Sequence, residues 1–273
     1  LAGKVRAKEL SPVEVIEASI ERMDKLEPLL HAFCTPGPDL ARAAAKQLEA
    51  DIMAGKDPGP LAGVPIGVKD LICTKDLPTV SGSFAYKDFN GGVDDVVVER
   101  LRAAGAIVTG KTNVPEFGYS GAGHNPVFET SRNPWDLERN PGGSSAGAGA
   151  AVAAGMGPFA IGSDGGGSVR IPCSYSGLYG LKPTFGRVPN HPREGLFCMT
   201  STEGPMTRSV ADAALMLNTL ALPDAQDWYA LPHDDRDWRD TMGGGVADLK
   251  IAYAPGLGGA VVDDEGRALT DTA

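Results

Sequence analysis

Two helical patterns open the chain. The residues SPVE at positions 11–14 supply a capping serine, a proline suited to the first helical turn and a glutamate that completes a capping box. Apolar residues then recur every three or four positions, at Val13, Ile16, Ile20, Met23 and Leu26. This spacing predicts an amphipathic helix, and a second, acidic helix is expected at residues 40–54 after a Pro/Gly break.

Further along, strand-like and helix-like patterns alternate. The stretch GPLAGVPIGVKDLI at residues 59–72 sets β-branched residues between small ones, as in a short buried strand that ends at Lys69 and Asp70. Residues 94–113 predict a helix, a glycine stop and a strand. Helices are also expected at 146–154 and 210–221, strands at 158–162 and 249–256, and the start of a helix in the final DEGRALTDTA. The alternation predicts an α/β fold, with a mixed, twisted β-sheet core covered by helices on both sides.

Composition narrows the function classes. The 273 residues are 42% hydrophobic, enough for one large core or two modest ones. The net charge of −10 argues against DNA or RNA binding, because nucleic-acid binders usually carry a basic surface. The chain has four cysteines, at Cys34, Cys73, Cys173 and Cys198. They form no CxxC pair and no zinc-like cluster with histidine, so we expect reduced thiols, no metal and a cytoplasmic protein.

An uncharged run at residues 140–163 has the length of a membrane span. It is nevertheless rich in weakly apolar alanine and glycine, is interrupted by Pro158, and has no flanking aromatic belt. We therefore expect this run to pack inside the protein and expect no membrane association.

The end of this run and the residues after it carry two serine clusters set in glycine, for which three chemical interpretations compete. A phosphate-binding loop is disfavoured, because GxxxxGK[ST] is absent and the GxGxxA match at Gly155 follows a helix instead of a strand. A nucleophile elbow would centre on Ser145, within the GxSxG match at residues 143–147, but a turn-rich segment precedes it. Its histidine would have to come later, and His191 and His233 lie in Pro/Asp-rich loops.

The third interpretation joins both serine clusters to the lysine at the end of the buried strand. A serine hydroxyl is a poor nucleophile until a base removes its proton, and Lys69 could be that base if its environment keeps it neutral. A second serine could carry the proton between the two groups. The glycines at 165–167, directly before Ser168, leave backbone N–H groups that can stabilise a tetrahedral oxyanion.

The chain resembles the amidase signature family along nearly its whole length. The resemblance rests on six ordered motifs: GPLAGVPIGVKD, AAGAIVTGKTNVPEF, SRNPWDLERNPGGSSAG, GSDGGGSVRIP, GLKPTFGRVP and EGPMTRSVADAALML. It implies hydrolysis of carboxylic amides through a Ser–cis-Ser–Lys triad. Ser168 then resembles the nucleophile, Ser144 the bridging serine after a cis peptide bond, and Lys69 the base. The resemblance also implies an oxyanion hole made by the backbone N–H groups of Gly165, Gly166, Gly167 and Ser168.

Neighbouring residues are expected to support this site. Asp164 and Arg170 flank Ser168 and should pair to hold its loop, and Ser145 should support the triad by hydrogen bonding. Two positions depart from the family pattern: Ala146 replaces the fifth residue of GGSSGG, and Gly165 stands where members usually carry Thr or Ile. Family members are also longer. Residues 1–273 are therefore expected to form an amidase signature domain that is incomplete at its C-terminus and slightly trimmed at its N-terminus.

The resemblance leaves two alternatives open. The glutamyl-tRNA(Gln) amidotransferase A subunit uses the same triad, with partner subunits, to free ammonia from glutamine. NVPEF and SVRIP in this chain differ from the NMDEF-like and SIRQP or SIRLP patterns of that protein. The other alternative is a non-catalytic amidase-like binding protein, against which the complete triad argues. We expect a hydrolase that acts on a small-molecule amide through an acyl-enzyme, without a cofactor or metal, and a homodimer is compatible with this interpretation.

A lysine base predicts a characteristic pH dependence. It must be neutral before it can accept a proton, and a lysine ordinarily titrates near about 10.4. Burial lowers the pKa of a lysine, whereas pairing with a nearby acid such as Asp70 raises it. We expect activity to rise with pH through the neutral to mildly alkaline range.

Overall fold

The computed structural model divides the chain into two compact units, residues 1–240 and residues 241–273. It describes residues 1–192, 199–240, 242–247, 249–256 and 258–272. The second unit contains helix α8, Asp264–Thr272, where the sequence predicts the start of a helix. The strand predicted at 249–256 is wrong, and Ile251 and Tyr253 in that segment are mostly exposed. A strand needs a neighbour for its backbone groups, and the described residues of this unit supply none.

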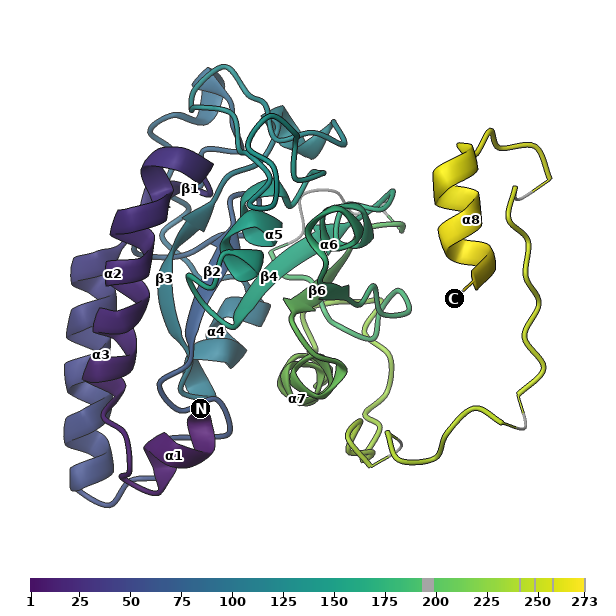
Figure 1. Cartoon of the computed structure of the whole chain (residues 1–273). Coiled ribbons are helices and arrows are strands. Elements are labelled where there is room, and N and C mark those ends of the chain that lie inside the picture. The colour runs from purple at the N-terminus through teal and green to yellow at the C-terminus, as the bar shows by residue number, and fades with distance from the viewer. Residues whose placement is uncertain (193–198, 241, 248, 257, 273) are drawn as a thin grey trace. The chain divides into compact units, whose positions relative to one another are not determined.

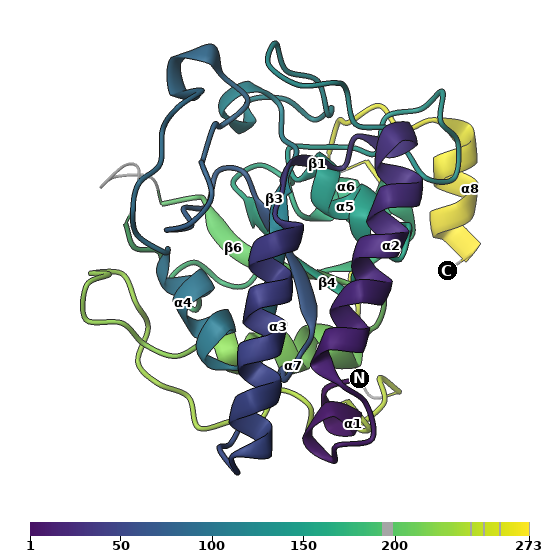
Figure 2. The same ribbon diagram turned by 90° about the vertical axis from the view of Figure 1, so that its left-hand side faces the viewer.

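Three helices open the first unit, with α2 and α3 side by side (Figures 1 and 2). Ser11 and Glu14 form the predicted capping box at the start of α2. The apolar face of α2 buries Ile16 and Ile20 against Ala41 of α3, which confirms the predicted amphipathic helix. The helices are α1 Ala2–Arg6, α2 Pro12–Leu30 and α3 Pro38–Met53.

Among the described residues, six strands form one mixed sheet in the order β1-β3-β2-β4-β6-β5. The central strands β3, β2 and β4 are parallel, and the outer pairings are antiparallel. Because parallel strands end at one edge of a sheet, the last residues of these three strands lie at the same edge. The strands are β1 Phe33–Pro36, β2 Pro65–Lys69, β3 Ile107–Thr112, β4 Phe159–Asp164, β5 Tyr179–Gly180 and β6 Thr202–Thr207.

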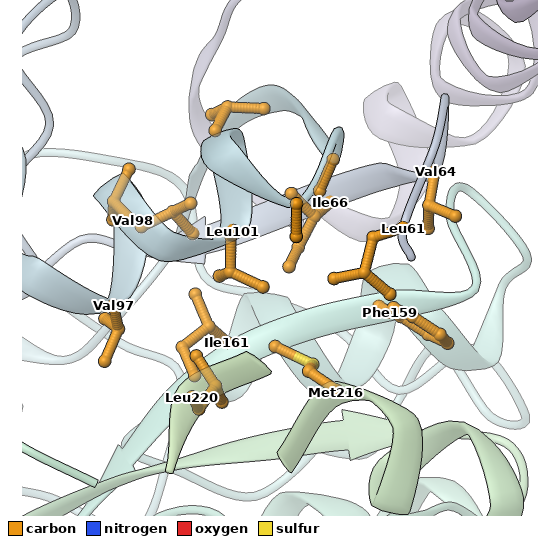
Figure 3. Packing of buried hydrophobic residues seen from close by; sticks show 14 of the residues in the cluster. Leu61, Val64, Ile66, Val97, Val98, Leu101, Phe159, Ile161, Met216 and Leu220 are labelled. Carbon is orange, nitrogen blue, oxygen red and sulfur yellow. The ribbon is translucent and has the colours of Figure 1, made fainter. Parts of the chain in front are cut away.

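Helices cover both faces of the sheet, which confirms the predicted α/β architecture. Successive residues of a strand point to opposite faces, and β4 separates the two layers in this way. Ala160 packs with α5 and α6, whereas Ile161 packs with Leu101 of α4 and Leu220 of α7 (Figure 3). The four helices are α4 Val96–Ala103, α5 Ala146–Ala153, α6 Arg170–Ser176 and α7 Val210–Leu220.

Close packing explains the small side chains of α5. Every residue from 146 to 152 is buried. A Cβ atom added to Gly147 would lie 2.0 Å from the carbonyl oxygen of Ala32 and 2.4 Å from the backbone nitrogen of Asn113. The uncharged run is therefore a core helix followed by β4. None of the described helices is both long and apolar enough to cross a membrane.

Several elements carry no signal in the sequence. The residues TEGPMT of β6 include glycine and proline, which are depleted in strands, yet all six residues are buried. Pairing with both β4 and β5 stabilises this strand. The short elements α1, β1, β5 and α6 are likewise not predicted, nor are the 3-10 turns Phe84–Tyr86 and Glu116–Gly118.

Candidate active site

A cleft of about 640 Å³ lies where two parallel strands end. Lys69 is the last residue of β2, and Ser163 and Asp164 are the last residues of β4. Ligands of open α/β sheets bind outside the carboxyl ends of the strands. Both glycine–serine segments contribute to the lining of the cleft, with Gly143 and Ser144 from the first and Ser163, Gly165, Gly166 and Ser168 from the second.

The side chain of Lys69 is completely buried and points to serine oxygens. Its Nζ lies 2.8 Å from Ser144 Oγ, 3.0 Å from Ser163 O and 3.0 Å from Ser163 Oγ. Lysine is rarely buried unless it is paired or functional. Sequence reasoning missed Ser163, although its position beside Asp164 in GSDGGGSVRIP could have drawn attention to it.

Ser144 and Ser145 lie at the start of α5 and are both buried. The peptide bond between Gly143 and Ser144 is cis, as the resemblance implies. Ser145 donates from its Oγ to Ser163 O at 3.4 Å and from its backbone N–H to Ser168 O at 3.2 Å. Ser145 therefore connects the two glycine–serine segments, so that Ser144 and Ser168 face one cleft.

Asp164 organises the loop that carries Ser168. Its carboxylate accepts from the backbone N–H of Gly167 at 2.6 Å and of Val169 at 3.2 Å. It also accepts two hydrogen bonds from the Arg170 guanidinium, at 2.9 and 3.0 Å, so these two side chains do pair. Burial acts to raise the pKa of Asp164, but the hydrogen bonds from Arg170 and the two N–H groups outweigh it and lower the pKa to about 2.

This low pKa predicts an acid-sensitive contribution to stability. Since the folded protein binds the proton less tightly than the unfolded chain, Asp164 stabilises the fold above pH 4 and loses this effect as the pH falls toward 2. About 1 kcal/mol of it should be gone at pH 3. Urea unfolding of the wild type and Asp164→Asn at pH 5 and pH 3 would measure it. Between pH 5 and pH 3 the wild type should lose about 1 kcal/mol more of its free energy of unfolding than Asp164→Asn. Equal losses in the two proteins would contradict the prediction.

The glycines before Ser168 have different surroundings. Gly165 and Gly166 are exposed in the cleft, and their N–H groups donate to no group in the described residues. Gly167 is buried, and Asp164 already accepts its N–H. Its φ of +120° is one that L side chains rarely adopt, and an added Cβ would meet Ile171 Cδ1 at 2.8 Å. A Cβ at Gly165 would meet nothing closer than 3.8 Å, so packing does not require the glycine at this departure from the family pattern.

A matched pair of alanine substitutions should separate these two glycines. Gly167→Ala should destabilise the fold by about 1–3 kcal/mol, because the left-handed backbone and the Ile171 contact both oppose a Cβ. Gly165→Ala should change the free energy of unfolding by less than about 0.5 kcal/mol. Denaturant unfolding of both variants tests the difference, and equal stabilities would show that the Gly167 conformation is not constrained.

Other candidate nucleophiles and bases lie elsewhere. No histidine is among the described residues that line the cleft, and His233 contacts the exposed Asp235 at 3.0 Å. Cys173 is buried in α6, and burial raises the pKa of its thiol to about 12. Within the part of the chain that the structure describes, Cys34, Cys73 and Cys173 form no disulfide bond, and Cys198 lies outside that part. The described residues also contain no cluster of three or more His, Cys, Asp or Glu side chains that could hold a metal ion.

A second buried lysine sits on the neighbouring strand. In the pairing of β2 with β3, Lys111 lies opposite Val68, and Thr112 lies opposite Lys69. Sequence reasoning considers Asp70 as a partner for Lys69. In the structure the Asp70 carboxylate lies 3.4 Å from Nζ of Lys111, and both of these side chains are fully buried.

Comparison with known proteins adds family evidence to this geometry. The amidase family model matches residues 14–273. Over 265 residues the chain is 43% identical to an acylamidase of Rhodococcus erythropolis, covering 97% of this chain and 56% of that protein. It is 42% identical over 254 residues to the glutamyl-tRNA(Gln) amidotransferase A subunit of Carboxydothermus hydrogenoformans, covering 92% and 52%. The chain thus spans about half the length of the curated relatives it matches.

Solved structures show the same relationship. A bacterial aryl acylamidase of the amidase signature family superposes with a TM-score of 0.85 at 38% identity, over 90% of this chain and 51% of that one. The peptide amidase of Stenotrophomonas maltophilia superposes with a TM-score of 0.81 at 34% identity, over 88% and 51%. In both cases this chain corresponds to about half of the solved chain.

Proposed function

The chain belongs to the amidase family, and on that premise we propose that the protein hydrolyses a carboxylic amide to an acid and ammonia or an amine. One observation carries the proposal: the buried 2.8 Å hydrogen bond between Lys69 Nζ and Ser144 Oγ, at a cleft that Ser168 also lines. The similarity to an acylamidase and to a peptide amidase supports an amide as the substrate class.

In the proposed first step, Ser168 Oγ attacks the amide carbonyl carbon. Ser144 takes the proton from Ser168 and passes its own proton to a neutral Lys69 amine. A relay suits this arrangement, because Lys69 is wholly buried whereas Ser168 is partly exposed in the cleft. Activation of a weak hydroxyl by an adjacent base is the general requirement for a serine nucleophile.

The negative charge that develops on the carbonyl oxygen needs preorganised donors. We assign this role to the backbone N–H groups of Gly165, Gly166 and Ser168, which donate no hydrogen bond to any described residue. The resemblance also includes the N–H of Gly167, but Asp164 accepts it in the structure. Gly167 therefore contributes by holding the shape of the loop.

Collapse of the tetrahedral intermediate breaks the C–N bond. The leaving nitrogen takes a proton back along Lys69 and Ser144 and departs as ammonia or an amine, leaving an ester on Ser168. Water then attacks this ester, with the same relay accepting its proton, and the acid is released as Ser168 recovers its hydroxyl. The three side chains thus return to their starting protonation states.

The direct test is a screen of the purified protein over short aliphatic, aromatic and peptide amides, with glutamine included. Release of ammonia or amine is measured together with labelling of Ser168 by a fluorophosphonate, which is located by mass spectrometry. We expect turnover of at least one simple amide and a label on Ser168. A folded protein that neither turns over these amides nor reacts with the probe would instead be a non-catalytic relative.

The similarity to a component of the amidotransferase supports a second candidate function. In that case the same cleft would free ammonia from glutamine within a complex. Co-purification with a second protein chain, and glutamine hydrolysis only in its presence, would favour this function. Turnover of simple amides by the isolated protein favours the amidase.

A further inference from the structure

The two buried lysines of the central strands meet different partners. Lys69 contacts the hydroxyl groups of Ser144 and Ser163. Lys111 donates to Thr79 Oγ1 at 2.7 Å and lies 3.4 Å from Asp70 Oδ1. Because Lys111 pairs across from Val68, and Lys69 follows Val68, the two lysines occupy opposite faces of the sheet.

Asp70 directly follows Lys69 in the chain, and its side chain leaves the opposite face of the sheet, on the side of Lys111. Both residues are fully buried, where charges are only weakly screened, so the charge of Asp70 acts on the proposed base across the strand. The carboxyl group of Asp70 is fully buried, and a carboxylate in such a position favours the charged form of a neighbouring lysine. A protonated Lys69 cannot accept the proton of Ser144. An uncompensated Asp70 would therefore slow the proposed reaction at neutral pH.

Lys111 provides this compensation. Burial raises the pKa of Asp70 and lowers that of Lys111, and the attraction between the two groups opposes both effects. Whichever partner holds the proton, the pair carries no net charge. Lys111 supplies the opposite charge at 3.4 Å, and the N–H of Val80 donates to Asp70 Oδ1 at 3.2 Å.

We propose that Lys111 is a positioning residue of the amidase reaction, which neutralises Asp70 so that this carboxylate, buried on the opposite face of the same strand, does not hold Lys69 in its protonated form. The inference rests on the proposed function, in which Lys69 is the base. It gives Lys111 an electrostatic role in addition to its hydrogen bonds to Pro78 and Thr79, which join β3 to the loop that contains these two residues.

Two thiols face the same pair and do not replace Lys111. Cys34 of β1 donates to the carbonyl oxygen of Lys111 at 3.4 Å. Burial, and after it the charge of Asp70, raises the pKa of the Cys34 thiol well above its usual range, so Cys34 is uncharged. Cys73, in the loop after β2, acts on Lys111 only in its anionic form. Neither thiol can supply a positive charge.

The test follows the rate at which a fluorophosphonate labels Ser168 as a function of pH, which requires no knowledge of the substrate. Asp70→Asn leaves Lys111 uncompensated and should move the rise in labelling rate about one pH unit lower. Lys111→Met leaves Asp70 uncompensated and should move it about one unit higher. In Asp70→Asn, Lys111 keeps its hydrogen bond to Thr79, and in Lys111→Met, Asp70 keeps the hydrogen bond from the N–H of Val80. The remaining group therefore stays charged over part of the pH range of the experiment.

Two further variants separate charge from structure. The double variant Asp70→Asn/Lys111→Met has no charge at either position and should restore the wild-type profile. Thr79→Val removes a hydrogen bond of Lys111 but no charge, and should leave the pH of the rise unchanged. If the pair of Asp70 and Lys111 only stabilised the fold, its single variants would lower the labelling rate or the melting temperature. They would not shift the pH of the rise in opposite directions.

Single variants that leave the rise in place, or a double variant displaced from the wild type, would overturn the proposal. If circular dichroism shows that one single variant is unfolded, the other single variant and the double variant decide in the same way, because the double variant buries no charge. Failure of the proposed function itself would give a different result from failure of the role proposed for Lys111. Labelling would then persist in Ser168→Ala, or its pH dependence would survive Lys69→Met, and both proposals would fall.

Discussion

Replacement of Ser168 by alanine should lower kcat for amide hydrolysis by at least about 10⁴-fold, because the acyl-enzyme forms on this oxygen. The fold should persist, because the loop is held by the backbone N–H groups of Gly167 and Val169, which donate to the Asp164 carboxylate, and these bonds do not involve the Ser168 hydroxyl. Ammonia release and circular dichroism on the same preparation would measure both expectations. The fluorophosphonate label should also disappear.

Ser145→Ala is the matched control for this variant. Ser145 is buried beside Ser144, and its Oγ makes a 3.4 Å contact with the carbonyl oxygen of Ser163. Loss of so weak a hydrogen bond should cost no more than about tenfold in activity. An active Ser168→Ala together with an inactive Ser145→Ala would instead support a nucleophile elbow centred on Ser145.

Lys69→Met should lower kcat/KM by about 10²–10⁴-fold, the usual contribution of a general base, and should remove the rise of activity with pH. Methionine is chosen because Lys69 is fully buried and an apolar chain of similar length fills its space. Ser144→Ala should have an effect of similar size, since it removes the oxygen that Lys69 contacts at 2.8 Å. A pH profile of kcat/KM for each variant is the measurement.

Histidine and metal controls complete this prediction. A histidine base would place the rise near pH ~6.5, so His191→Gln and His233→Gln should both leave the profile in place. Addition of EDTA should leave the rate unchanged, because no step of the proposed mechanism uses a metal. Control of the profile by either histidine, or loss of activity with the chelator, would refute Lys69 as the base.

Elements with their own local signals could be predicted from the sequence. The capping box of α2 and the apolar spacing of its buried face are set by residues close together in the chain, and the structure confirms both. Strand β6 could not be predicted, because TEGPMT becomes a strand only by pairing with β4 and β5. The segment 249–256 is the converse, since it has a strand-like pattern but no partner strand among the described residues of its unit.

By itself the sequence determined which reactive groups the protein carries and in what order, through motifs that place Lys69, Ser144 and Ser168 in one recognisable series. Only the tertiary structure decided which buried lysine meets the serines and which meets the carboxylate of Asp70. It also showed that the N–H of Gly167 donates to the Asp164 carboxylate. The physical reason is that alternation along a strand puts neighbouring side chains on opposite faces without specifying what covers each face. That depends on contacts between distant segments, and the contact between Lys69 and Ser144 joins residues 75 positions apart.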